Sequence, residues 1–445
     1  MWFAYAEQKT GRVMRDMDLN AAQLEPAERV AGIIYPEDNL APVPNVIAGM
    51  QHVVAMFGAT VLGPILMGFN ANTAILFSGI ATLIFYLIVR GKIPSFLGSS
   101  FSFIAAVNAA TGYVAGSGTN PNIALALGGI IVAGVLYLGI GAIVAVAGHR
   151  WLERLMPPVV TGAIVAIIGL NLAPVAVREV SGSPFDTAFG LLTVALVVFS
   201  AVFLPKKLKL FPILVGGGVS YLLYYLAAGL FSDSAPINYE ALRQAAWFGL
   251  PKFTFPVFAW TPAMLIAPVS IVLVAENLGH VRAISAMLGR NLDASLGRAF
   301  MADGLATMVS ATFGGSGVTT YAENIGVMSI TKNYSSMTLV IAGLFAIFLG
   351  LSPKFGEAIH TIPEPILGGL AFILFGLITA NAGRIWRVGD VDFTDPRNLL
   401  VAGVAMVMGA GDLTLRFGSL VLGGIGTATF SALVLYHVVS RAKVQ

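Results

Sequence analysis

"GSGVTTYAENIGVMSITK", residues 315–332, is the stretch that decides the fold. Glu323 lies in an otherwise apolar part of the chain. It follows glycine and β-branched residues, which start helices poorly. A second stretch, "IPSFLGSSFSFI" at residues 93–104, is also rich in small, hydroxyl and aromatic residues. Such sequences suit a few residues of extended backbone followed by a short helix. We therefore expect two interrupted segments, each ending in a half-helix.

The composition is that of a membrane protein. Of the 445 residues, 57% are hydrophobic and only 11% are charged, whereas soluble domains carry about a quarter charged residues. Apolar runs of about 20 residues, long enough to cross a bilayer, recur along most of the chain. We expect an all-α polytopic membrane protein with fourteen segments, in which segments three and ten contain the extended stretches.

Several function classes are disfavoured. The chain has no cysteine, which removes disulfides, iron–sulfur clusters and zinc–thiolate sites. The five histidines are scattered without metal-ligand spacing, so we expect no metal and no cofactor other than a coupling proton. Basic residues lie in loops between apolar runs, which does not indicate a nucleic-acid partner. The absence of a recognisable nucleophile–base pair argues against an enzyme.

The distribution of Lys and Arg predicts the orientation. With the N-terminus inside, sixteen basic residues fall on inside loops and five on outside loops, which favours an even number of spans and two cytoplasmic ends. We expect a poorly ordered cytoplasmic tail, a first repeat, an extracytoplasmic loop, a second repeat and a C-terminal tail. Their ranges are 1–42, 43–231, 232–259, 260–440 and 441–445.

The two halves resemble each other. "PPVVTGAIVAIIGL" (157–170) matches "PEPILGGLAFILFGL" (363–377), and "GSSFSFI" (98–104) matches "VTTYAEN" (318–324). For either match alone, chance similarity of glycine- and proline-rich segments is the alternative. Because each half would hold seven segments, the second half enters the membrane upside down. Inverted repeats are typical of secondary transporters that bind substrate near the bilayer midplane between discontinuous helices.

Two acids are the strongest candidates for chemistry. Glu323 would lie in the first turn of a half-helix, where the helix dipole favours a carboxylate; an interfacial glutamate at a frayed end is the alternative. Glu276 follows a long apolar run in "SIVLVAENLGHVRA" (270–283), and His280 shares its helical face. Acids inside the membrane are functional candidates by default. Because an apolar environment favours the neutral form of a carboxyl group, such an acid suits a proton-coupled carrier.

Other polar and aromatic residues extend this set. We expect Asp303 to tie neighbouring segments together, although it could join a proton relay, and Gln51 and His52 to form interhelical hydrogen bonds. Phe101 and Tyr321 occupy equivalent places in the repeat and could flank a flat ring, with ordinary packing as the alternative for either alone. Two carboxylates, two aromatics and free backbone groups suit a small, planar, uncharged ligand such as a nucleobase. Two glutamates would repel an anion.

Several motifs resemble one known family. "ENIGVMSITK" (323–332), "QH" (51–52) and "AENLGH" (275–280) are similar to motifs of the nucleobase–cation symporter, or nucleobase–ascorbate transporter, family. "MQHVVAMFGATVLGPILMG" (50–68), "IPSFLGSS" (93–100) and "LGGIGTATF" (422–430) look most like bacterial uracil and pyrimidine permeases of the Rut-pathway type. The resemblance runs from about residue 45 to 440.

The resemblance implies a core domain (segments 1–4 and 8–11), a gate domain (segments 5–7 and 12–14) and a homodimer with the gate domains at its interface. It implies that Glu276 and Glu323 bind the base. Further residues it assigns to the site are the ring-flanking Phe101 and Tyr321, the backbone around Ala322, the closely approaching Ala59, and His280 as a support for coupling.

The resemblance predicts a proton symporter that imports uracil across the cell (inner) membrane, with thymine and xanthine open as substrates. Glu323 stands where purine carriers of the family tend to have Gln, which favours a pyrimidine. Phe101 departs from the Ala of the Rut-type permeases and is nearer the general uracil permeases. A xanthine or urate permease of the same fold is the nearest alternative, and an anion transporter with similar inverted repeats is another.

Overall fold

The computed structural model describes residues 32–115, 117–205, 208, 211–227, 230, 237–417 and 420–441. Residues 1–31 of the expected N-terminal tail, Lys206, Lys207 and Lys209, residues 232–236 of the expected loop and residues 442–445 lie outside the described part.

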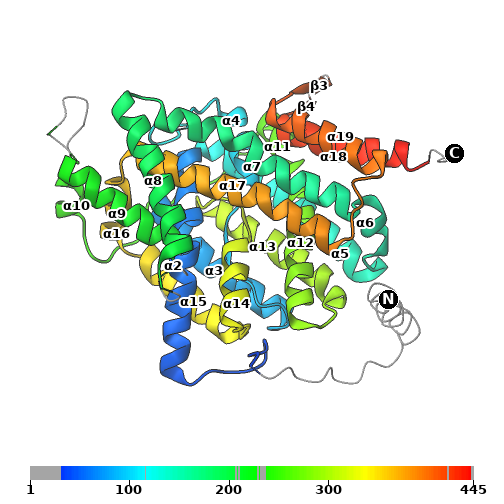
Figure 1. Ribbon diagram of the computed structural model, residues 1–445, viewed down its shortest axis with the longest axis horizontal. Helices are drawn as coiled ribbons and strands as arrows, with labels where there is room; N and C mark the ends of the chain where they lie inside the picture. The colour runs from blue at the N-terminus through cyan, green and yellow to red at the C-terminus, as the bar shows by residue number, and fades with distance from the viewer. Residues whose placement is uncertain are drawn as a thin grey trace, which may run out of the picture.

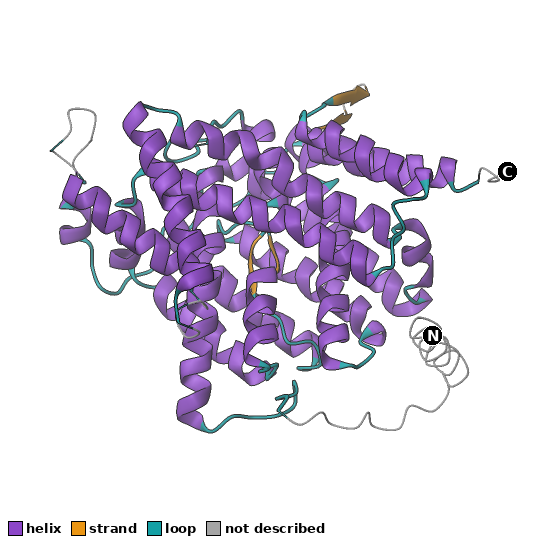
Figure 2. Cartoon of the chain, in the orientation of Figure 1, coloured by secondary structure: helices purple, strands orange, loops and turns teal. Residues whose placement is uncertain are grey.

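Two short strands lie side by side at the centre of the helical body, as Figure 2 shows. We call this antiparallel contact the strand crossing. Strand β1 (Leu97–Ser99) pairs antiparallel with β2 (Val318–Thr320). The ladder continues on both sides, because Ser100 donates its N–H to the Gly317 carbonyl (2.9 Å) and Tyr321 donates to the Phe96 carbonyl (3.0 Å). Each strand leads into a half-helix, α4 (Ser102–Thr111) and α14 (Ala322–Thr331). The two predicted extended stretches are thus confirmed, and each satisfies the backbone of the other.

Glycine permits this crossing. A Cβ built on Gly98 would overlap the ring of Tyr321, and one built on Gly317 would overlap the ring of Phe103. The strands can therefore lie against aromatic side chains only because these two positions carry no side chain.

A first group of helices packs around the crossing (Figure 1). In this group α5 packs along α13, and α3 packs along α15 and α13. Close approach is possible because a Cβ at Gly134 or Gly304 would collide with the backbone of the opposite helix, as is common where membrane helices pack through small residues. Besides α4 and α14, its helices are α2 (Pro42–Met67), α3 (Ala71–Val89), α5 (Ile123–Ala147), α11 (Trp260–Ile266), α12 (Val269–Leu288), α13 (Leu296–Thr312) and α15 (Ser336–Gly350).

A second group lies against the first. Its centre is the pair α7 and α17, the two helices that begin at the matched proline-rich sequences, with Pro157 and Pro363 as their N-caps. The indole of Trp386 in α17 donates to the Val159 carbonyl at the start of α7 (3.2 Å). Its elements are α7 (Pro158–Val180), α8 (Pro184–Phe203), α9 (Pro212–Ala227), α17 (Glu364–Val388), α18 (Pro396–Ala410), α19 (Gly424–Val439) and the hairpin of β3 (Leu415–Phe417) and β4 (Leu420–Leu422).

Short helices connect these elements. Helix α6 (Arg150–Leu155) joins α5 of the first group to α7 of the second, and α16 (Pro353–His360) joins α15 to α17. Helix α16 bends away from α15 by 81°. The remaining short helices are α10 (Glu240–Gln244) and the 3₁₀ turn η1 (Asp293–Ser295).

The helices have the length and composition of a polytopic membrane protein. Among the described residues, seven helices are long and apolar enough to span a bilayer, or eight if α15 and α16 count as one bent span. Helices α4, α9, α18 and α19 are apolar but shorter. Helix α4 is short because part of its segment forms β1. The helical membrane architecture is therefore as expected, and the count of fourteen segments stays a prediction.

The expectation of a poorly ordered N-terminal tail is wrong for residues 32–41. Ile34 donates its N–H to the Lys332 carbonyl (3.0 Å) and accepts from the N–H of Tyr334 (2.8 Å). Glu37 forms an ion pair with Arg290 (2.9 Å), whose guanidinium also lies 4.1 Å from the ring centre of Tyr35. Backbone pairing of this kind leaves no periodic pattern in the sequence, so the composition of the tail did not reveal it.

We predict that Gly98→Ala lowers the thermal stability of the purified protein. The new methyl group would press on the Tyr321 ring, whose hydroxyl is held by hydrogen bonds to Ser99 and Thr60, and overpacking of this kind costs about 1–3 kcal/mol. The matched control is Gly218→Ala in α9, where an added Cβ meets nothing within 4 Å. Thermal unfolding in detergent measures both variants. Equal melting temperatures for the two would contradict the close packing at the crossing.

Candidate substrate-binding site

Glu276 lies near the middle of α12 and faces the start of half-helix α4. Its Oε2 atom accepts hydrogen bonds from the hydroxyls of Ser102 (3.2 Å) and Ser100 (3.4 Å). These serines immediately follow β1, so the strand crossing fixes where they stand. The carboxylate therefore meets two hydroxyl donors and the positive end of a helix dipole, both of which stabilise a negative charge.

Glu323 occupies the equivalent place on the second half-helix, in the first turn of α14. The sequence prediction of that position is confirmed. Glu276 and Glu323 are both half-buried. The β1–β2 ladder brings the start of α4, which Glu276 contacts, beside the strand that leads into α14 and Glu323. The residues that follow them, Asn277 and Asn324, are fully buried. Each helix thus anchors an amide in the protein interior and leaves a carboxylate on a face that is not fully covered.

The two candidate aromatics differ in their surroundings. The ring of Tyr321 packs on Gly98, and its hydroxyl donates to the Ser99 carbonyl (2.9 Å) and accepts from Thr60 (3.2 Å). Tyr321 thereby holds the crossing together. Phe101 instead meets Phe375 of α17 edge-on, with ring centres 5.7 Å apart. Phe101 therefore lies at the boundary between the two helix groups.

Ala59 and Ala322 are each next in sequence to a residue of the Tyr321 contact. Ala59 is buried in α2, next to the Thr60 that bonds the Tyr321 hydroxyl. Ala322 is the first residue of α14 and is half-buried. The backbone N–H of Ala322 belongs to the first turn of this helix, where backbone donors lack intrahelical partners.

His280 lies one turn beyond Glu276 and is buried. Its Nδ1 atom is 2.8 Å from the Thr320 hydroxyl at the end of β2. Thr320 is the last residue of β2, so the partner of His280 belongs to the strand crossing. The contact ties the helix of one carboxylate to the strand that leads to the other.

Asp303 has the supporting surroundings that were expected of it. Its Oδ2 atom accepts from the Asn277 amide (2.7 Å) and from the Tyr137 hydroxyl (3.4 Å), and the Asn277 amide also reaches that hydroxyl (3.0 Å). All three side chains are fully buried. The network joins α5, α12 and α13 directly behind Glu276.

His52 makes an interhelical hydrogen bond of the kind that was expected. The Asn324 amide donates to the His52 carbonyl and lies within 3.0 Å of its Nδ1 atom, which joins α14 to α2. Gln51 precedes His52 and is half-buried.

Sequence reasoning missed most of the partners of these residues. They are Thr60, Ser100, Ser102, Tyr137, Asn277, Thr320 and Asn324. A signal for two of them was present, because the triplet "AEN" occurs at both 275–277 and 322–324. Its repetition, once inside α12 and once at the start of half-helix α14, could have marked each asparagine as the anchor of its glutamate.

Three cavities follow the boundary between the two helix groups. The largest, about 500 Å³, is lined by Asn70 and Lys252 on the side of the first group and by Glu179 and Glu364 on that of the second. A second, of about 70 Å³, separates α12 from α7 and α17, and a third, of about 30 Å³, lies between Ser102 and α19. Within the described part of the chain, none of these three is lined by both Glu276 and Glu323.

The chain matches known proteins over most of its length. A model of the Permease family matches residues 44–417. The chain is 51% identical over 422 residues to the "Putative pyrimidine permease RutG" of Escherichia coli (strain K12), covering 95% of both proteins. It is 38% identical over 392 residues to the "Uracil permease" of the same organism, covering 85% of this chain and 87% of the relative.

Two solved structures share the fold. The transmembrane domain of the cyanobacterium bicarbonate transporter BicA has a TM-score of 0.65 at 18% identity, covering 87% of this chain and 96% of that one. The murine anion transporter Slc26a9 in the inward-facing state also has a TM-score of 0.65, at 12% identity, covering 96% and 74%. At these identities the likeness concerns the fold alone.

We predict that Asn277→Leu destabilises the protein by about 1–3 kcal/mol, because it removes the shorter of the two hydrogen bonds to the buried Oδ2 atom of Asp303. Tyr137→Phe should cost less, since the bonds that its hydroxyl donates, to Asp303 (3.4 Å) and to the Leu273 carbonyl (3.3 Å), are both long, and the Asn277 amide keeps Asp303 as a partner. Chemical or thermal unfolding of the purified variants measures both losses. The reverse order of the two losses, or an unaffected Asn277→Leu variant, would contradict the supporting role of this network.

Proposed function

This chain belongs to the nucleobase–ascorbate transporter family, and from that membership we propose that it is a secondary active transporter that imports uracil by proton symport. The observation that carries the proposal is the pair Glu276 and Glu323, each beside the N-terminus of a half-helix, where the strands that lead into the two half-helices pair with each other. Relatives at 51% and 38% identity are described as pyrimidine and uracil permeases, which supports the choice of substrate.

The chemistry of the pair suits a neutral base. Uracil has ring N–H groups that donate hydrogen bonds and carbonyl oxygens that accept them. Glu276 and Glu323 supply acceptors, whereas the first-turn N–H of Ala322 and the hydroxyls of Ser100 and Ser102 supply donors. The ring of Phe101, at the group boundary, can cover one face of the base. In this proposal Tyr321 has a structural role, since its hydroxyl already forms hydrogen bonds with Ser99 and Thr60.

The same pair offers a way to couple the proton. Two carboxylates at close range repel each other, and a proton on one of them removes the repulsion. The protonated pair can then both donate to and accept from the base, so proton and base each raise the affinity for the other. His280 and Asp303 contribute by holding α12 in place through Thr320 and Asn277.

Transport requires the site to face both sides in turn. We assign the first helix group as the core domain and the second as the gate domain, so that the site residues move with the core. The three cavities along the boundary leave it incompletely packed, which favours sliding of one group past the other over deformation of either.

The proposal places the protein in the cell (inner) membrane with both ends in the cytoplasm, as a homodimer joined through the gate domains. Helix α8 of the second group exposes Leu191, Phe199 and Phe203. Such an apolar surface suits contact with lipid or with a second copy.

We predict that Glu276→Gln and Glu323→Gln each weaken uracil transport. A glutamine keeps the size but loses the charge-assisted hydrogen bond, which is worth about 1.5–3 kcal/mol, or roughly a 10- to 100-fold loss of apparent affinity. Uptake of radiolabelled uracil by cells lacking other uracil carriers measures the effect. Glu240→Gln, on the exposed helix α10, is the matched control. Wild-type uptake by both membrane-inserted site variants would refute the assignment.

We predict that the driving ion is the proton. Vesicles containing the purified protein should accumulate uracil under an inward proton gradient and not under a sodium gradient, because the candidate ion-binding groups are carboxylates that can be protonated. In the same vesicles, excess xanthine should leave the uptake of labelled uracil unchanged. Accumulation driven by sodium would contradict the coupling, and accumulation of labelled xanthine without that of uracil would indicate a purine permease of the same fold.

A further inference from the structure

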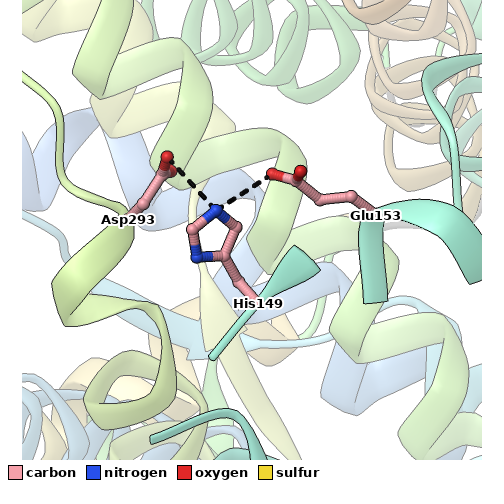
Figure 3. Close-up of side chains that lie close together, drawn as sticks. All are labelled: His149, Glu153 and Asp293. Atoms are coloured by element: carbon pink, nitrogen blue, oxygen red, sulfur yellow. Dashed lines mark ion pairs between the residues drawn. The ribbon is translucent and has the colours of Figure 1, made fainter. Parts of the chain in front are cut away.

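A cluster of titratable side chains lies away from the carboxylate pair, where α5, α6 and η1 meet (Figure 3). The Nε2 atom of His149 is 3.4 Å from Oε1 of Glu153 and 3.5 Å from Oδ2 of Asp293. Figure 3 shows both carboxylates directed at this one ring nitrogen. The mechanism proposed above uses none of the three residues.

The local backbone presents these side chains in fixed places. His149 is the N-cap residue of α6 and stands four residues before Glu153, on the same helical face. Gly148, with a φ of 78°, makes the sharp turn from α5 into α6. Asp293 lies in a turn closed by the hydrogen bond from its own N–H to the Asn291 side chain (2.7 Å). The third side chain thus comes from a turn far away in the sequence.

We propose that His149, Glu153 and Asp293 form a binding site for a transition-metal dication of the Zn²⁺ class. One imidazole nitrogen and two carboxylate oxygens are ligands that zinc accepts. A tetrahedral ion with bonds of about 2.0–2.1 Å holds neighbouring ligand atoms about 3.3–3.4 Å apart, close to both distances from Nε2. The three ligand atoms all lie within 4.8 Å of one another, and water would complete the coordination.

Access and charge also suit an ion. The side chains are 24%, 31% and 28% exposed, so a hydrated ion can reach them and exchange its water for ligands. Two carboxylates supply the negative charge that a dication requires. The site is therefore accessible to a metal ion from solution and carries the negative charge needed to bind it.

Arg282 competes with such an ion, because its guanidinium forms an ion pair with Oε1 of Glu153, the same atom that faces His149. A carboxylate offers about four lone-pair positions, so Glu153 can keep this partner and still ligate a metal. Hydrogen-bonded carboxylates are usual around metal sites. The positive charge of Arg282 nevertheless repels a cation, and its removal should tighten metal binding.

The position of the cluster gives the ion a structural effect. Helix α6 is the connection from α5 of the first group to α7 of the second, and η1 lies between α12 and α13 of the first group. A metal bound by all three side chains would fasten the connecting helix to the first group.

Titration of the purified full-length protein in detergent with Zn²⁺, followed by calorimetry, tests the site. We expect one ion per chain for the wild type, binding weakened roughly tenfold or more in His149→Ala and in Asp293→Asn, and tighter binding in Arg282→Gln. His437→Ala, in α19, is the matched control and should bind like the wild type. Co²⁺ provides a second readout, since it should quench the fluorescence of Trp151 in α6 in the wild type and not in His149→Ala.

The outcomes separate clearly. Absence of binding by the wild type at about 1 mM Zn²⁺ would overturn the proposal. This concentration lies far above the dissociation constants of structural zinc sites. Unchanged affinity in both His149→Ala and Asp293→Asn would overturn it as well, by placing the ion elsewhere. These measurements do not involve uracil, so a negative result would leave the proposed transport function unaffected. A failure of the uracil uptake assays would likewise leave the proposed metal site unaffected.

Discussion

The structure depends on one constraint, which is that backbone polar groups inside a membrane must find partners within the protein. Two segments of this chain run as extended backbone before their half-helices begin, and the N–H and C=O groups of these stretches pair with each other in the β1–β2 ladder. Gly98 and Gly317 make room for that ladder beside aromatic rings. Every other feature of the site follows from where the two strands cross and where the half-helices α4 and α14 begin.

The crossing gathers polar groups in an otherwise apolar body. The start of α4 supplies the hydroxyls that reach Glu276, and the start of α14 supplies Glu323. Behind them, buried amides fix the helices: Asn277 binds Asp303, and Asn324 binds the backbone of His52. Buried hydrogen bonds of this kind position the carboxylates without covering them. The acids can therefore serve a ligand while the structure is stabilised by their neighbours.

The sequence predicts the parts of this arrangement that local chemistry determines. Runs of Gly, Ser and Thr marked the two breaks, and an acid in an apolar stretch marked Glu276 and Glu323. Contacts that join distant segments left no such pattern: neither the hydrogen bond of the Tyr321 hydroxyl to Ser99 nor the pairing of Ile34 with Tyr334 has a periodic signature. The approach of Asp293 to His149 is of the same kind. The Tyr321 ring also shows that a residue type suited to stacking can be engaged in structure instead.

The central claim is that one flat neutral base lies between Glu276 and Glu323. The most direct measurement is an experimental structure of the purified protein with uracil bound. We expect density for the base at the group boundary, within hydrogen-bonding distance of both carboxylates and beside Phe101. Density for uracil only at a position remote from the two glutamates, for example in the large cavity near Lys252 and Glu364, would contradict the account.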